Sequence, residues 1–398
     1  MTVDVPRRPA LADRRARVAV AVLFFTNGAL FANLLPRYPE IKADLGIDNA
    51  VYGLAVAAFP TGAIAAGLLA GVLVRRAGSA RVAVAGTVLT GAAIIAAAVA
   101  DSVLLFAGAL LFAGAMDAIT DVAQNAHGLR VQRRYGRSII NSFHAIWSVG
   151  AVTGGSMAAG AIALGLPRGQ HLSISAVVFG VAACIALRFC LPGPETEPNS
   201  RADAEGRESP QRTGLRTAYL LLALVLIATA GTLVEDAGNS WAALYLSGSL
   251  HASAAVAASG YIALVGAQFV GRLVGDRLVD RFGQRAVARA GGLIAATGMG
   301  LALAVTTVPG TILGFAAAGL GVATLVPAAM HEADELPGLK PGLGLTIVSW
   351  LMRLGFLLSP PIVGLIADAT SLRVGLLVIP FAGLLVLVFA GALRPRRW

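Results

Sequence analysis

Long apolar runs, separated by short polar and basic segments, dominate this chain. Each run is long enough to cross a hydrocarbon core of about 30 Å, because a helix rises about 1.5 Å per residue. Segments of period two, which would indicate a membrane β-barrel, are missing. The pattern therefore predicts an all-α membrane protein with twelve transmembrane helices, at residues 18–38, 50–74, 82–100, 103–128, 139–165, 172–191, 217–246, 254–275, 286–307, 311–332, 343–369 and 373–393.

A polar, proline-rich stretch at residues 192–216 interrupts this pattern and indicates a cytoplasmic linker. It joins an N-terminal six-helix bundle, residues 1–191, to a C-terminal six-helix bundle, residues 217–398. The loop after the second helix, 76–81 (RAGSAR), is echoed after the eighth by 281–285 (RFGQR). An offset of about half the chain is typical of two similar halves related by an axis along the membrane normal. We expect two pseudo-symmetric bundles.

The charge distribution predicts the topology of the chain in the membrane. Only 13% of the 398 residues are charged and 57% are hydrophobic, while the formal net charge is +10. The basic residues gather in alternate loops, together with both termini, which is the positive-inside pattern. We expect a multi-pass protein of the bacterial inner membrane with both termini in the cytoplasm. The basic charge does not indicate a nucleic-acid partner.

Several kinds of chemistry are not indicated by the sequence. The two cysteines, Cys184 and Cys190, fall in one apolar run, so we expect neither a disulfide nor a metal site. Nucleotide-binding loops, serine nucleophile motifs and metal-ligand spacings are missing. We therefore expect no enzyme, no cofactor and no ATP-driven pump. The first helix continues too far to be a cleaved signal peptide.

The two repeated loops resemble the signature of the major facilitator superfamily between helices two and three, and its copy between helices eight and nine. In the first copy Arg75 stands where the family usually has Asp; in the second, Asp276 occupies the glycine position. The resemblance implies a charged cytoplasmic latch that favours the outward-facing state. The residues of this latch would be Gly71, Arg76, Gly78, Asp276, Asp280, Arg281 and Gly283, with Arg285 also fitting the motif.

Three further segments, residues 121–126, 135–148 and 235–245, resemble a branch of uncharacterised bacterial permeases that is distantly similar to the fucose–proton symporters. In those symporters the fourth helix carries an acidic residue followed four positions later by Asn, and Asp121 and Asn125 match that spacing. This resemblance does not indicate which substrate is transported.

The fourth predicted helix has a polar stripe. Asp117, Asp121, Gln124 and Asn125 fall on one face of an otherwise apolar helix, which must therefore look inward. An ionised carboxylate at membrane depth costs several kcal/mol. A low dielectric favours the neutral form of a carboxyl group, which suits a proton carrier. Asp121 and Asp117 are thus candidates for proton coupling; the alternative is a permanent salt bridge or a packing hydrogen bond.

Other polar residues inside the apolar runs complete the candidate site. Glu235 is a third candidate for binding a proton or the substrate. Alternatively, it lies in the solvated periplasmic opening and has neither role. His144 is a possible relay partner or a neutral packing residue. Arg353, interpreted as the only basic residue deep in an apolar run, would clamp an anionic substrate, neutralise Asp121 or Asp117, or form a purely structural pair. The candidate substrate-binding residues are Asn27, Asn125, Asn141, Trp147, Asn239, Trp241, Tyr261, Gln268 and Arg353.

The sequence therefore predicts a monomeric secondary transporter that moves a small molecule by alternating access, driven by protons. Symport of a small polar solute such as a sugar and proton-antiport efflux of a drug or secondary metabolite both stay open. Sodium is an alternative coupling ion, because carboxylates and Asn oxygens also suit it. A membrane sensor that binds ligand without transporting it is a third hypothesis.

Overall fold

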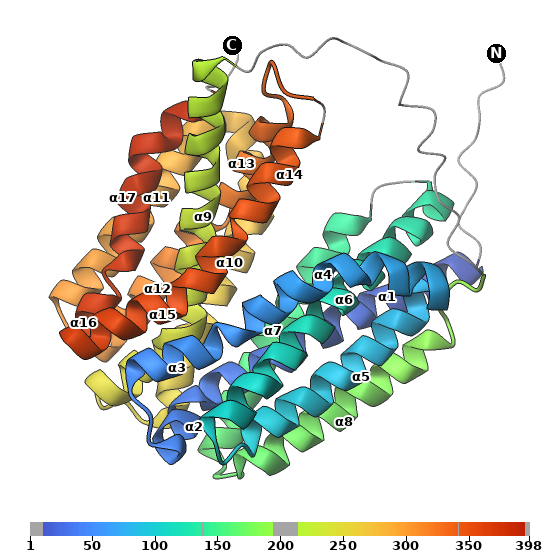
Figure 1. Ribbon diagram of the computed structural model, residues 1–398, viewed down its shortest axis with the longest axis horizontal. Helices are drawn as coiled ribbons and strands as arrows, with labels where there is room; N and C mark the ends of the chain where they lie inside the picture. The colour runs from blue at the N-terminus through green and yellow to red at the C-terminus, as the bar shows by residue number, and fades with distance from the viewer. Residues whose placement is uncertain (1–10, 137–138, 194–213, 341, 395–398) are drawn as a thin grey trace. The chain divides into compact units, whose positions relative to one another are not determined.

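The computed structural model describes residues 11–136, 139–193, 214–340 and 342–394, and within these ranges the chain is helical with no strand (Figure 1). Twelve helical segments are long and apolar enough to span a membrane, which confirms the predicted number. The largest differences are at helix ends: the fourth span, for example, continues to Tyr135 instead of ending at 128. The described residues pack as two compact units.

The described residues of unit 1 are 11–37, 58–136 and 139–193. Its helices are α1 (Leu11–Leu34), η1 (Leu35–Arg37), α4 (Ala58–Ala77), α5 (Ser79–Ala98), α6 (Val103–Tyr135), α7 (Ile140–Ala163) and α8 (Arg168–Leu187).

Glycines bring α1 and α7 of unit 1 into backbone contact. A Cβ atom at Gly28 would lie 2.2 Å from the carbonyl oxygen of Trp147, and one at Gly150 would lie 2.2 Å from that of Phe25. Small residues at helix crossings allow such close approach in membranes. The resulting contact places Asn27, which directly precedes Gly28 on α1, beside α7.

Replacing Gly150 is therefore expected to destabilise unit 1. Gly150→Val adds side-chain atoms where the Phe25 backbone already lies, and overpacking of this kind costs about 1–3 kcal/mol. The thermal unfolding midpoint in detergent should fall. Gly160→Val is the matched control, because a Cβ at Gly160, on the same helix, meets no atom within 4 Å. Equal midpoints for the two variants would contradict the close contact between α1 and α7.

The described residues of unit 2 are 38–57, 214–340 and 342–394. Its elements are α2 (Tyr38–Leu45), α3 (Asn49–Val56), α9 (Leu215–Leu244), the π-helical turn η2 (Tyr245–Ser249), α10 (Ala254–Phe282), α11 (Gln284–Ala304), α12 (Val308–Val322), α13 (Leu325–Asp334), α14 (Leu343–Leu351), α15 (Arg353–Ala369), α16 (Leu372–Gly375), α17 (Val378–Phe389) and η3 (Ala390–Ala392). The bundles 1–191 and 217–398 remain our proposal; most of the predicted linker, 192–216, lies outside the described residues.

Residues 38–57 pack on α9 and α15, although they precede these helices in the chain by more than a hundred residues. Asp368 accepts hydrogen bonds from the amides of Asn49 (3.1 Å) and Ala50 (2.7 Å), so it caps the start of α3. The hydroxyl of Tyr52 donates to the carbonyl oxygen of Ser240 at 2.8 Å. A Cβ at Gly364 would lie only 2.3 Å from the carbonyl oxygen of Asn49. We call residues 38–57 the docked segment.

The two repeated loops have the same backbone conformation. Gly78 has φ 86° and ψ 141°, and Gly283 has φ 83° and ψ 154°; each directly precedes a helix. Both amides donate to the carbonyl four residues earlier, of Val74 and Val279. A positive φ favours glycine, because side chains with a Cβ are strained there. The repeat seen in the sequence is thus a repeat in structure at these loops.

Candidate functional site

Asn27 of α1 connects three helices of unit 1. Its Nδ2 donates to Oδ1 of Asp117 on α6 at 2.7 Å, while its Oδ1 accepts from Nε1 of Trp147 on α7 at 2.8 Å. The same oxygen lies 3.5 Å from Nε2 of Gln124 on α6. Asn27 and Gln124 are buried. A buried amide with its donor and its acceptor both used is held in one orientation.

A second set of contacts continues from Gln124. Its Nε2 lies 3.4 Å from Oδ1 of Asp121, and Nδ2 of Asn125 donates to the same oxygen at 2.9 Å. Oδ1 of Asn125 lies 3.1 Å from Nε2 of His144 on α7, so in this arrangement the histidine nitrogen is the donor. The ring of His144 meets Phe24 edge-on, with centroids 5.2 Å apart.

The contacts form one chain of polar groups through unit 1, which we call the α6 network: Asp117, Asn27, Trp147, Gln124, Asp121, Asn125 and His144. All of these residues except Gln124 were predicted site residues, and Gln124 was part of the predicted stripe. The two carboxylates differ in setting. Asp117 is partly buried and, within the described ranges, has no cationic partner, whereas Asp121 is exposed.

Unit 2 contains a smaller polar cluster on α9 and α10. Oε2 of Glu235 accepts from Nε2 of Gln268 at 2.7 Å and lies 3.8 Å from Nη2 of Arg272. Arg353 was therefore wrongly interpreted as the only basic residue deep in an apolar run, since Arg272 also lies within the eighth span. Arg272 follows Gln268 by four residues on α10, so helical spacing alone could have identified it.

The two partners of Glu235 are expected to contribute unequally to stability. Gln268→Leu removes the buried donor and leaves the carboxylate poorly satisfied, which costs about 1–3 kcal/mol. Arg272→Gln removes a longer, more exposed ion pair, and such pairs contribute about 0–1 kcal/mol. Thermal midpoints in detergent should therefore fall more for Gln268→Leu. The reverse order would show that the ion pair dominates.

The other predicted residues of unit 2, Trp241, Tyr261, Asn239 and Arg353, form no hydrogen bond with one another within the described ranges. Trp241 is fully buried, with its ring edge-on to Tyr52 at 4.9 Å, and Tyr261 is also buried. Oδ1 of Asn239 and Nε1 of Trp241 are buried without a hydrogen-bond partner among the described residues. Arg353, at the start of α15, is exposed and makes no hydrogen bond or ion pair with the described part of the chain.

Asn141 and Asp236 differ in burial. Asn141, a predicted substrate-binding residue, is exposed on α7 and makes no polar contact with the described residues. Asp236, which is not among the predicted site residues, is buried and lies 3.5 Å from the hydroxyl of Ser240.

The predicted latch residues are mostly exposed. Arg76, Asp276 and Asp280 form no ion pair within the described ranges, and Arg281 stacks over its neighbour Phe282 at 5.4 Å. Gly71 lies within α4, Gly78 lies between α4 and α5, and Gly283 lies between α10 and α11. The latch function of these residues remains a prediction.

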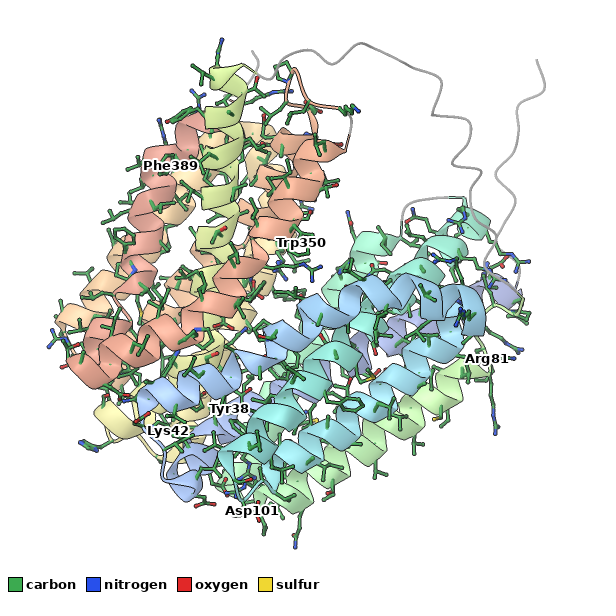
Figure 2. The ribbon with its side chains drawn as sticks, in the orientation of Figure 1. Tyr38, Lys42, Arg81, Asp101, Trp350 and Phe389 are labelled. Atoms are coloured by element: carbon green, nitrogen blue, oxygen red, sulfur yellow. The ribbon has the colours of Figure 1, made fainter. Side chains whose placement is uncertain are left out.

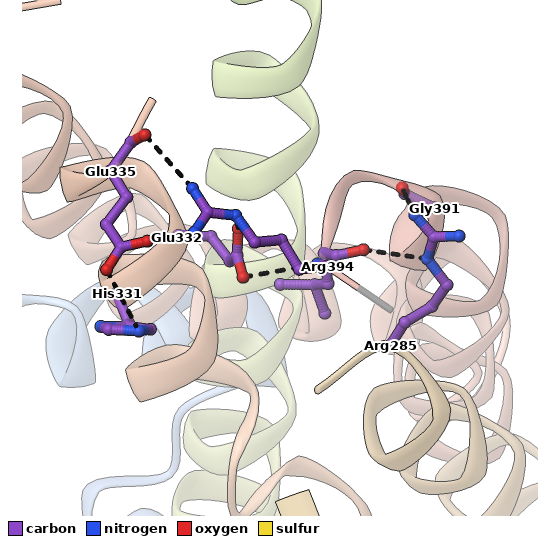
Figure 3. A network of polar contacts seen from close by, with 7 residues as sticks. Arg285, His331, Glu332, Glu335, Gly391 and Arg394 are labelled. Carbon is purple, nitrogen blue, oxygen red and sulfur yellow. Dashed lines mark hydrogen bonds and ion pairs between the residues drawn. The ribbon is translucent and has the colours of Figure 1, made fainter. Parts of the chain in front are cut away.

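A different polar network lies beside the second of the two repeated loops, residues 281–285 (Figure 3). Arg285 donates to the carbonyl oxygens of Leu393 (2.9 Å) and Gly391 (2.7 Å), at the end of η3. Arg394 pairs with Glu332 of α13 at 3.1 Å and with Glu335, which in turn faces His331. The sequence analysis placed Arg285 in the repeated motif but did not predict these contacts. Glu332 of α13 and Glu335, which directly follows α13, are distant from Arg394 in the chain.

Twelve spans in two helical units, with carboxylates and amides inside the spans, define a polytopic membrane protein of the transporter class. The family model of the Major Facilitator Superfamily matches residues 20–277 and 220–397, and the chain belongs to this family. The membrane protein MosC of Rhizobium meliloti is 30% identical over 407 residues, which cover 97% of this chain and 96% of MosC. The uncharacterized transporter y4wD of Sinorhizobium fredii is 29% identical and covers 94% and 97%.

Solved structures share the fold. A mutant of the nucleoside transporter NupG superposes with a TM-score of 0.76 at 12% identity, over 95% of this chain and 100% of that one. A D-xylose–proton symporter superposes with a TM-score of 0.73 at 15% identity, over 95% and 98%. The protein is thus a multi-pass membrane transporter of the major facilitator fold, as predicted.

Proposed function

We propose that the protein moves a small polar solute across the bacterial inner membrane by proton symport, as a monomer with both termini in the cytoplasm. The observation that carries this proposal is the α6 network, in which two carboxylates inside membrane spans are joined through amides to a histidine. A D-xylose–proton symporter shares the fold, which is compatible with this assignment and does not by itself assign a substrate.

Protonation of Asp121 would change the α6 network in a defined way. An ionised carboxylate only accepts hydrogen bonds, whereas a protonated one also donates. Nδ2 of Asn125 now donates to Asp121, and Oδ1 of Asn125 faces His144. A protonated Asp121 that donates to Oδ1 of Asn125 competes with His144 for that oxygen. Proton binding on α6 is thereby linked to the contact between α6 and α7.

Asp117 responds to a proton by the same logic. Its ionised form accepts from Asn27, whose oxygen already faces Trp147 and Gln124. A protonated Asp117 no longer requires the amide donor, which frees Asn27 to turn toward a solute hydroxyl. Substrate and proton would then share Asn27, and this sharing provides the physical basis for coupling.

We propose that polar residues of unit 2 also bind the solute. Asn239, Trp241, Tyr261 and Gln268 offer amide, indole and hydroxyl groups, and two of these groups have unpartnered polar atoms. Trp241 is covered by Tyr52 of the docked segment, so we propose that the segment leaves α9 when the solute enters or departs.

Efflux of a drug by proton antiport is the second candidate. A cationic drug needs an available carboxylate, and Glu235 is the acid that would suit it in unit 2. Glu235 already contacts Gln268 and Arg272. We therefore favour a neutral, hydroxyl-bearing solute over a cationic one.

The test is flux in proteoliposomes under an imposed pH gradient, with sugars, nucleosides and cationic aromatic drugs as candidate solutes. Symport predicts that the solute and protons move in the same direction. Movement in opposite directions would establish antiport. Solute flux that follows a sodium gradient and not a pH gradient would show that sodium is the coupling ion. Binding of a solute without any flux would contradict the proposal.

A further inference from the structure

An apolar groove of about 490 Å³ lies between α5 and α8 on the surface of unit 1. It is lined by Val88 and Ala92 of α5 and by Val177, Val181, Ile185 and Arg188 of α8 and its end. The apolar side chains are strongly exposed, with Val177 at 62% and Ile185 at 53%. Because both helices span the membrane, this groove faces lipid or detergent rather than water.

Small residues create the groove. A Cβ added at Gly91 would lie 3.2 Å from the side chain of Ala176, and one added at Gly180 would lie 3.8 Å from the side chain of Val88. The helix backbones therefore lie close together. The larger Val181 and Ile185 stand beside the seam and form a wall, so a furrow remains along the pair.

The register of the two helices places two arginines at one end of the groove. The contacts of Gly91 with Ala176 and of Gly180 with Val88 show that α5 and α8 run antiparallel. Continuing this register brings Arg188, at the end of α8, level with the first turn of α5, which contains Arg81. Arg81 precedes Val88 by seven residues and therefore shares its helix face. Figure 2 labels Arg81 at one end of unit 1.

Both arginines are available to a ligand. Each is exposed and forms no hydrogen bond or ion pair with another described residue. Neither α5 nor α8 contains an acidic residue that would repel an anion. Arg81 lies in the first turn of α5, where the helix dipole adds a partial positive charge.

We propose that this groove binds an anionic phospholipid, with one acyl chain along the furrow and the phosphate between Arg81 and Arg188. The length fits one leaflet: from Arg188 to Val177, α8 rises about 16 Å, which is about half of a 30 Å hydrocarbon core. The guanidinium fork suits phosphate oxygens, and basic residues at the ends of membrane helices attract anionic headgroups. The site is separate from the α6 network and needs no transport step.

Cys184 provides a reporter, because it lines the groove and its thiol is free. The full-length protein with Cys190→Ser is purified in detergent, and dioleoyl phosphatidylglycerol or dioleoyl phosphatidylcholine is added. Alkylation of Cys184 by N-ethylmaleimide is timed, and native mass spectrometry counts the bound lipids. Phosphatidylglycerol should slow alkylation at a far lower concentration than phosphatidylcholine does. Each arginine should contribute roughly a fivefold preference for phosphatidylglycerol over phosphatidylcholine. The double variant Arg81→Gln, Arg188→Gln should therefore lose a preference of roughly 25-fold.

Arg133→Gln is the matched control, since it removes an exposed arginine of α6 that has no described partner and does not line the groove. It should leave the preference unchanged, and thermal midpoints establish that all variants are folded. The proposal fails if both lipids shield Cys184 equally, or if the double variant keeps the preference. Shielding by glycerol 3-phosphate alone would also overturn it, because the ligand would then be a free phosphate and not a lipid.

Discussion

Asp121→Asn is expected to abolish solute-driven proton flux, with a loss of at least tenfold in proteoliposomes. The substituted amide cannot release a proton, yet it keeps the shape of the side chain and can still bond to Asn125 and Gln124. The variant should therefore fold and bind solute. Solute exchange without a gradient should survive, because exchange needs the conformational cycle and not net proton movement.

A matched control and a second acid make this result specific. Asp101→Asn removes an exposed carboxylate outside the spans and should leave proton flux intact. Full gradient-driven transport by Asp121→Asn would contradict our assignment and move the proton site to Asp117 or Glu235. Loss of exchange as well as flux would show that Asp121 is needed for the cycle itself.

Gly364→Val is expected to reduce transport about tenfold by displacing the docked segment. A Cβ at this position would lie 2.3 Å from the carbonyl oxygen of Asn49, and overpacking costs about 1–3 kcal/mol. Since about 1.4 kcal/mol is a factor of ten in an equilibrium, the ratio of docked to released conformations should fall about tenfold. Release of the docked segment can also be measured by cysteine labelling. Tyr52 is buried, so the cysteine of Tyr52→Cys should react faster with a maleimide when Gly364→Val is also present.

Gly266→Val is the control for this prediction. It lies on α10 in the same unit, and a Cβ there meets no atom within 4 Å. It should leave both the flux and the cysteine reactivity near those of the parent. Unchanged transport by Gly364→Val, with faster labelling of the cysteine, would show that docking of residues 38–57 is not needed for the cycle.

One feature of the candidate site follows directly from the sequence. Asp117, Asp121, Gln124 and Asn125 share one helix, and helical periodicity is a local property that can be read from spacing. The partners across the network are different. That Asn27 bonds to both Asp117 and Trp147 depends on how α1 packs between α6 and α7, through the glycine contacts of Gly28 and Gly150.

The errors have similar physical causes. Arg272 was not predicted as a site residue, although it follows Gln268 by one helical turn. Its ion pair with Glu235 connects α10 to α9, and the sequence does not show which helices meet. Arg353 lies inside an apolar run of the sequence, but in the structure it is exposed and forms no hydrogen bond or ion pair with another described residue. A periodic pattern gives the face of a helix and not its neighbour.

The sequence by itself determined the class of this protein. The length of each apolar run, the number of runs and the stripe on the fourth helix are local features, set by the thickness of the membrane and the pitch of a helix. Only the tertiary structure decided that residues 38–57 pack on α9 and α15, and that Asn27 joins three helices. These contacts depend on the close approach of backbones that are distant in the chain, and no local pattern specifies which glycine meets which carbonyl.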